Sequence, residues 1–198
     1  DRVGEAELVA QTRQVLEQID WPCTVKTLLR DTNWGLRRGV CDALDWFFAQ
    51  EDYGIVVEDD CLPDPTFFAF CEDLLQRYAH DPRVMHIAGS NLAEQHTAHL
   101  NSSFVWSKFS LVWGWASWRR AWQQMSLDLE GLDDFARDEL HSFLPGNPLA
   151  QAYLLDKFRV TQAGRNQSWA YAWFYSILKH KGLCIVPTRN LIQNVGVG

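Results

Sequence analysis

Apolar and polar positions along the first half of the chain follow two periods, one typical of amphipathic helices and one typical of buried strands. Apolar residues recur at helical spacing in three segments, which predicts helices over residues 5–18, 36–48 and 65–78. Short β-branched and apolar runs between them predict strands over residues 24–29, 55–57 and 84–88. Trp21-Pro22 ends the first helix, because a residue before proline is pushed out of helical geometry.

The pattern becomes less regular after Gly89. We expect a strand over residues 104–106, a helix over 116–125, mainly helices thereafter and a last strand over 183–186. Strands joined through helices pair in parallel in most folds. The sequence therefore predicts one α/β domain over residues 1–198 with a mostly parallel sheet flanked by helices. Residues 1–91 form its regular half, and residues 92–198 form an irregular, Trp-rich half.

Composition narrows the class of protein. The 198 residues suffice for one domain, and 47% hydrophobic with 22% charged residues is typical of a globular chain. A net charge of −7 without a basic cluster argues against a nucleic-acid partner. No apolar run is long enough for a transmembrane segment, which leaves peripheral membrane association open. Five cysteines without a CxxC pair predict reduced, mostly buried thiols in a cytoplasmic protein.

Three carboxylates directly follow the predicted strand over residues 55–57, in the run Glu58-Asp59-Asp60. Ligands of open α/β sheets bind outside the carboxyl ends of strands. Adjacent negative charges at such a place repel one another unless a cation compensates them. Oxygen ligands of this kind suit Mg²⁺ or Mn²⁺, which would stabilise a phosphate leaving group. The alternative is a solvated acidic turn between a strand and a helix.

The residues around this run resemble the metal-binding acidic motif of GT-A glycosyltransferases. The likeness is to the N-acetylglucosaminyltransferases of protein N-glycans and to bacterial sugar transferases with the same layout. It extends over most of the chain, through the segments Val57–Asp60, Leu62–Pro65, Phe67-Phe68, Asn33–Gly35, Asp45–Phe48, Trp113–Ala116 and Gly182–Asn194. The resemblance implies a GT-A, Rossmann-like fold in which residues 1–91 bind a nucleotide sugar and residues 92–198 face the acceptor.

The resemblance also implies roles for particular residues. Asp60 would bind Mn²⁺ or Mg²⁺ directly, and Glu58 and Asp59 would face hydroxyls of the donor's sugar and ribose. Four residues at the start of a helix would lie near the nucleotide: Asn33, Gly35, Arg37 and Arg38. Free backbone amides at a helix start attract an anion. An exposed basic helix start is an equal alternative for the two arginines.

Ten tryptophans form the second candidate feature. The resemblance places Trp113-Gly114-Trp115 near the donor sugar and the acceptor, although a core role for both indoles fits the sequence equally well. Trp118 and Trp122 are expected in the core, and His86 is expected to be a buried residue with satisfied hydrogen bonds.

The resemblance also bears on the catalytic base. The resemblance implies that Trp169 lines the donor site. In the family, a carboxylate beside the corresponding tryptophan can act as the base, but Ala170 stands at that position. Asp156 and Asp134 are then the candidate bases.

These observations imply a metal-dependent glycosyltransferase that moves a sugar from a nucleotide-diphosphate donor, preferably a UDP-sugar, to the hydroxyl of a glycan or another acceptor. Two alternatives remain: a sugar- or nucleotide-binding domain without catalysis, and a metal-dependent phosphohydrolase. A GT-A domain normally opens with a strand, and related sequences continue to a histidine near the metal. We therefore expect this chain to lack a segment at both ends.

Overall fold

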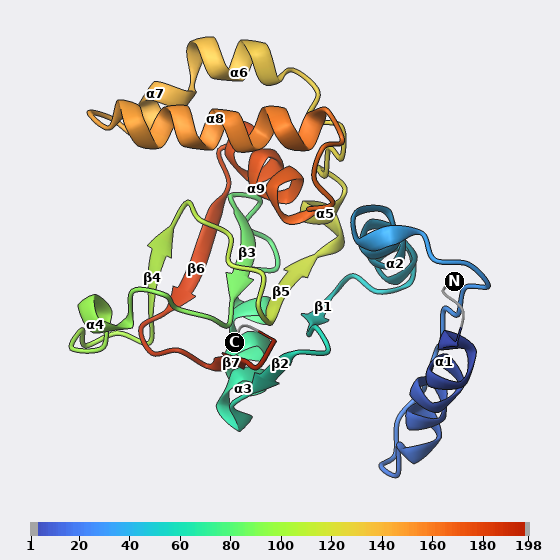
Figure 1. The fold of residues 1–198 in the computed structure, drawn as a ribbon. Helices are drawn as coiled ribbons and strands as arrows, with labels where there is room; N and C mark the ends of the chain where they lie inside the picture. Colours follow the sequence, from blue (N-terminus) through green and yellow to red (C-terminus); the bar gives the residue numbers. More distant parts are fainter. Residues whose placement is uncertain (1–3, 197–198) are drawn as a thin grey trace.

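The computed structural model describes residues 4–196 as a mixed α/β structure (Figure 1). Its larger helices are α1 (Glu5–Gln14), α2 (Gly35–Gln50), α3 (Pro65–Arg77), α6 (Leu132–Asp138), α8 (Pro148–Gln162) and α9 (Ala170–Lys179). Shorter helices are the 3-10 helix η1 (Val15–Gln18), α4 (Glu94–Thr97), α5 (Arg119–Trp122) and α7 (Leu140–Phe143). The strands are β1 (Tyr53–Val56), β2 (Cys61–Pro63), β3 (Val84–Ala88), β4 (Phe104–Ser107), β5 (Trp115–Trp118), β6 (Leu183–Pro187) and β7 (Ile192–Asn194).

The central five-stranded sheet is mixed, with the strand order β1-β5-β3-β6-β4. Among the described strands only β3 and β6 pair in parallel, and the other ladders of this sheet are antiparallel. The expectation of a mostly parallel sheet is therefore wrong. Its physical cause is β5, which comes from the second half of the chain and inserts between β1 and β3 in the opposite direction. The two expected halves consequently share one sheet.

Three strands nevertheless run in the same direction. Because β1 and β3 both pair antiparallel with β5, they point the same way, and β6 is parallel to β3. The carboxyl ends of β1, β3 and β6 thus lie at one end of the sheet, together with the amino end of β5 (Figure 1). A small antiparallel ladder between β2 and β7 lies at this same end.

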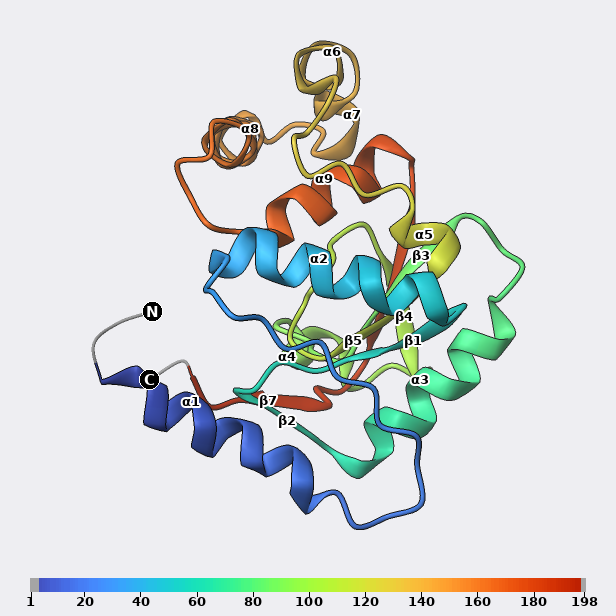
Figure 2. The same ribbon diagram turned by 90° about the vertical axis from the view of Figure 1, so that its right-hand side faces the viewer.

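Helices cover both faces of the sheet. On one face, α3 packs through Phe67, Cys71 and Leu74 against Ile87, Ala116 and Ile185 of the strands. On the other face, α2, α5 and α9 enclose Trp115, together with Trp122, Trp169 and Trp173. Figure 2 shows α2 lying across the sheet, with α6 to α9 gathered at the end opposite β2 and β7. These four helices bury a third apolar cluster around Phe158 and Tyr175.

Local sequence signals account for the starts of two long helices. The Asp64 carboxylate accepts a hydrogen bond from the Thr66 backbone N–H at 2.9 Å, and Pro65 occupies the first helical position of α3. Asn147 and Pro148 begin α8 in the same way, with the Asn147 side chain accepting from the Ala150 N–H at 3.0 Å. Capping side chains satisfy backbone donors that the first turn leaves unpaired, and proline loses nothing at that position.

Three predicted elements differ from the structure. Residues 24–29 belong to no described sheet. The helix expected over 116–125 begins only at Arg119, because residues 115–118 form strand β5. The first helix ends at Gln14 and continues as η1, and none of its residues is buried, so Leu8, Val9, Val15 and Leu16 expose their side chains.

The ends of the chain add little to this description. Segments expected to be missing at either end would adjoin residues 1–3 and 197–198, which lie outside the described residues. Among residues 4–196, no helix combines the length and the apolar run that a bilayer crossing requires.

Candidate functional site

The candidate site lies at the carboxyl end of the sheet, where segments that are distant in sequence meet. Glu58, Asp59 and Asp60 follow β1, and Gly89 to Leu92 follow β3. The chain after β6 returns as β7 and pairs with β2, so that Cys61 lies opposite Asn194. Cys61 and Asn194, which are 133 positions apart in the sequence, are therefore neighbours beside the carboxylates.

Three side chains form the acidic cluster: Glu58, Asp60 and Cys61. One ligand atom from each lies within 4.8 Å of the other two. Cys61 is buried, Glu58 and Asp60 are half-buried, and Asp59 is exposed outside the cluster. The structure therefore confirms the proximity of Glu58 and Asp60. It also places the thiol of Cys61 beside them, whereas the sequence predicted only a buried, reduced cysteine there.

Burial and mutual repulsion determine the electrostatics of the cluster. Burial raises the pKa of Glu58, and the negative charges of Asp60 and Asp59 raise it further. Burial and the hydrogen bond to Asp60 raise the pKa of Cys61 to about 11. The Cys61 thiol is therefore protonated near neutral pH and donates to Asp60 Oδ1 at 3.5 Å. A divalent cation would relieve the repulsion between the carboxylates.

The segment after β7 packs closely against Asp60. The Val195 N–H donates to the Asp60 backbone oxygen at 2.8 Å, and the Gly196 N–H donates to Asn194 Oδ1 at 2.9 Å. A Cβ atom on Gly196 would lie 2.4 Å from Asp60 Oδ2, which is too close for any side chain. The two carboxylates of the cluster fit a small, oxygen-ligated ion, with Glu58 and Asp60 as its ligands.

The four residues expected near a nucleotide lie together at the start of α2. Asn33 Oδ1 accepts from the Gly35 N–H at 2.7 Å, and Gly35 adopts a φ of 72°. The Arg37 guanidinium donates to the Leu127 carbonyl and lies 3.5 Å from Asp128, so it anchors a loop of the second half. Arg38 stacks over the Trp34 ring at 4.3 Å. Their contacts with a nucleotide stay a prediction.

The tryptophans divide into core and cavity residues. Trp115 and Trp169 are 0% and 3% exposed and pack against Trp122 and Trp173, so they present no open face to a ligand. Their expected contact with the donor is corrected to a core role, because both faces of the sheet around them are covered by helices. Trp113 is only half-buried and lines a cavity. Gly114, between Trp113 and Trp115 in the sequence, adopts a φ of 58°.

The candidate bases lie elsewhere. Asp134 belongs to α6 and pairs with Arg137 at 2.7 Å, and Asp156 is an exposed residue of α8. Both helices lie at the end of the molecule opposite the β2–β7 ladder (Figure 1). This placement separates both carboxylates from the acidic cluster and does not support them as its base, so that role stays a prediction.

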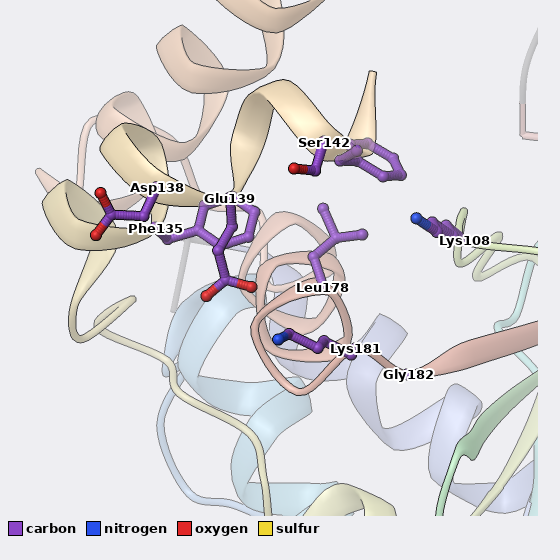
Figure 3. Close-up of a pocket in the computed structure, with 9 residues that line it drawn as sticks. Lys108, Phe135, Asp138, Glu139, Ser142, Leu178, Lys181 and Gly182 are labelled. Atoms are coloured by element: carbon purple, nitrogen blue, oxygen red, sulfur yellow. The ribbon is translucent and has the colours of Figure 1, made fainter. Parts of the chain in front are cut away.

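A cavity of about 460 Å³ also lies at that opposite end (Figure 3). Phe135, Phe143 and Leu178 supply apolar surface, and Lys181 and Gly182 directly precede β6. Because β6 runs toward the acidic cluster, this cavity is separated from the cluster by the length of the sheet. It contributes nothing to the candidate site.

No protein-family model matches the sequence, and no curated protein is significantly similar to it. The acidic cluster and the cavity beside Trp113 are thus the structural features that bear on the function of this chain.

Proposed function

We propose that this chain is a metal-dependent glycosyltransferase domain that uses a nucleotide-diphosphate sugar, preferably a UDP-sugar, as its donor. The single observation that carries the proposal is the convergence of Glu58 and Asp60 within the acidic cluster, beside the side-chain-free Gly196. The resemblance of the surrounding segments to GT-A glycosyltransferases supplies the reaction class.

In this proposal Asp60 and Glu58 hold Mn²⁺ or Mg²⁺, whose charge offsets the negative charge that develops on the departing diphosphate. Asp59, exposed beside the cluster, is available to accept hydrogen bonds from donor hydroxyls. The protonated Cys61 thiol orients Asp60 through their hydrogen bond.

The second candidate is a domain that binds a nucleotide sugar without transferring it. Ala170 is the observation that favours it, because α9 begins there without a carboxylate and Asp134 and Asp156 lie at the far end of the molecule. Formation of a glycosylated product would exclude this candidate. A phosphohydrolase would be favoured instead by metal-dependent cleavage of a phosphodiester without any sugar acceptor.

The metal assignment is tested by thermal unfolding with Mn²⁺ and UDP-sugars, added separately and together. We expect Mn²⁺ to raise the melting temperature of the wild type, since ligand at 100 times Kd stabilises the folded state by about 2.7 kcal/mol. Asp60→Asn should lose the metal-dependent rise.

The control is Asp133→Asn, which removes an exposed carboxylate on α6, away from the acidic cluster, and should keep the wild-type response. Equal Mn²⁺ responses in the Asp60 variant and the wild type would refute the assignment. Calorimetric titration of the same proteins then separates metal binding from donor binding.

A further inference from the structure

A second cavity lies at the carboxyl end of the sheet, next to the acidic cluster, with a volume of about 300 Å³. Among residues 4–196, no charged side chain contributes to its lining. Its walls combine three apolar side chains with four carboxamides: Trp113, Leu92, Ile192, Asn91, Asn190, Gln193 and Asn194. We refer to it as the Trp113 cavity.

The wall of the Trp113 cavity is built from close backbone contacts. The Gly89 N–H donates to the Gly114 carbonyl at 2.7 Å, and the Leu191 N–H donates to the Gly89 carbonyl at 3.0 Å. Ile192 fills the space over both glycines, because a Cβ atom on Gly89 or Gly114 would lie 2.7 or 2.4 Å from it. Three segments are thus locked together, and the cavity is formed before any ligand arrives.

Hydrogen bonds to the backbone fix the orientation of the carboxamides. Asn190 Oδ1 accepts from the Asn91 N–H at 2.9 Å, and Asn190 Nδ2 donates to the Ile192 carbonyl at 2.6 Å. A carboxamide has two N–H donors and two acceptor lone pairs, so Asn190 retains capacity beyond these two bonds. Gln193 is an exposed residue of β7.

This lining selects for an uncharged ligand that is rich in hydroxyl groups. The Asn91 carboxamide is engaged within the protein, where it donates to Thr97 and to two carbonyls and accepts from the Ala93 N–H. The Asn190 carboxamide can both donate to and accept from hydroxyls, and the apolar faces of Trp113 and Leu92 suit the C–H face of a sugar ring. A phosphate, a carboxylate or an ammonium group would find no opposite charge among the described lining residues, so its burial there would be unfavourable. The volume is at the lower limit of typical small-ligand pockets, which suits a single ring.

The Trp113 cavity and the acidic cluster are joined through one residue. Asn194 lines the cavity, and its Nδ2 atom lies 3.9 Å from Cys61 Sγ. Cys61 Sγ in turn lies 3.5 Å from Asp60 Oδ1. The cavity and the carboxylates are therefore neighbours, linked by Asn194 and Cys61, as a transfer between two substrates requires.

We propose that the Trp113 cavity binds a neutral pyranose and that this ring belongs to the sugar acceptor. The role as acceptor rests on the proposed function, a glycosyltransferase, and specifies an uncharged sugar as the acceptor of that enzyme. The binding of the ring itself requires neither the metal nor the donor.

The test uses the full chain without metal or nucleotide. Methyl glycosides of glucose, galactose and N-acetylglucosamine are titrated and followed by saturation-transfer NMR, alongside glucuronate and glucose 6-phosphate as charged analogues. We expect at least one neutral glycoside to bind with a Kd in the millimolar range and the charged analogues to bind at least about tenfold more weakly.

Two variants locate the binding site. Trp113→Ala removes the ring face, and Gln193→Lys places a cation at the exposed edge of the cavity without disturbing the core. Each substitution should weaken the binding of the neutral glycosides at least about tenfold. Trp106→Ala is the matched control, because Trp106 is an exposed indole of β4 that does not line the cavity, and it should bind like the wild type.

Three results would overturn the proposal: no neutral glycoside bound by the wild type, equal binding by Gln193→Lys, or preference for the charged analogues. The outcome is independent of the metal assignment. Glycoside binding that depends on Gln193, combined with no response to Mn²⁺ and UDP-sugars, would retain the sugar site and refute the transferase. The converse result would retain the metal site and refute the cavity.

Discussion

His86 shows how one buried residue sets the position of a loop. Its side chain is fully buried, stacks on Trp115 with ring centroids 5.2 Å apart, and its Nδ1 atom accepts from Trp173 Nε1 at 3.2 Å. Its other nitrogen lies 2.9 Å from the Leu111 carbonyl, so Nε2 carries the proton of a neutral ring. His86 thereby holds the chain two residues before Trp113, and its expected core role is confirmed.

The neutral state of His86 makes stability depend on pH. Burial lowers its pKa from 6.5 to about 4. Between these values the unfolded chain binds the proton and the folded chain does not, so the contribution of His86 is present above pH 6.5 and is lost as the pH falls toward 4. Wild type and His86→Gln should differ most at pH 7, and this difference should shrink by up to about 3 kcal/mol at pH 4.

Urea unfolding of both proteins between pH 4 and 7 measures this difference. His96→Gln, at an exposed histidine of α4, is the control and should follow the wild-type profile. A difference between wild type and His86→Gln that stays constant with pH would contradict the neutral assignment.

At the residue scale the sequence predicted Glu58 and Asp60 but not Cys61. The carboxylates are a local run after a strand, and their proximity follows from that run alone. The burial of Cys61 depends on β7, since Asn194 lies 133 positions away in sequence. Its place directly after the acidic run was the one available signal.

At the scale of elements, Arg120 joins α5 to the turn between α3 and β3. Its guanidinium donates to the carbonyls of Tyr78, Ala79 and Val84 at 2.9–3.0 Å and lies over the Trp118 ring at 4.4 Å. One side chain thus donates to three backbone carbonyls, of which that of Tyr78 also accepts from the Asp81 N–H at 3.1 Å.

Arg120→Met should therefore lower the free energy of unfolding by at least about 2 kcal/mol, because the carbonyls lose their donors in a partly buried site. Arg137→Met serves as its control. Arg137 pairs with Asp134 and Asp138 on an exposed surface, where ion pairs contribute little, so the melting temperature should hardly change. Equal effects of the two substitutions in thermal unfolding would contradict this account.

The helices α2 and α3 were predicted from the helical spacing of their apolar residues, and the strands β1, β3, β4 and β6 were predicted from short apolar runs. The pairing of strands was not predictable in the same way. Trp115, Trp118 and Trp122 fit a helical period, yet Trp115 and Trp118 belong to a strand whose alternate residues face opposite sides of the sheet. The direction of β5 depends on contacts that no local pattern encodes.

At the scale of the whole molecule, the covered sheet contrasts with the segment before α2. Residues 20–32 form no backbone–backbone hydrogen bond with any described residue. Side-chain contacts hold this segment instead, including the Lys26–Glu51 ion pair at 2.9 Å and the pairing of Arg30 with Asp42. The apolar run over 24–29 was predicted as a strand, but a strand needs a paired neighbour, which the described sheet does not offer it.

Hydrogen exchange should reveal this contrast. Amides of residues 20–32 should exchange within seconds at neutral pH, whereas those of β3 and β6 should exchange only on global unfolding, because both strands are paired on both sides. Mass spectrometry of peptic peptides measures both regions in one experiment. Slow exchange over residues 20–32 would show that they are paired in solution.

The packing of the indoles has an optical consequence. Trp115, Trp122, Trp169 and Trp173 lie with ring centroids between 5.1 and 6.5 Å apart. Chromophores this close couple their electronic transitions, so the near-ultraviolet circular dichroism of the protein should be strong and should originate mainly from this group. Loss of that signal with the far-ultraviolet spectrum retained would report loosening of the interior before the helices melt.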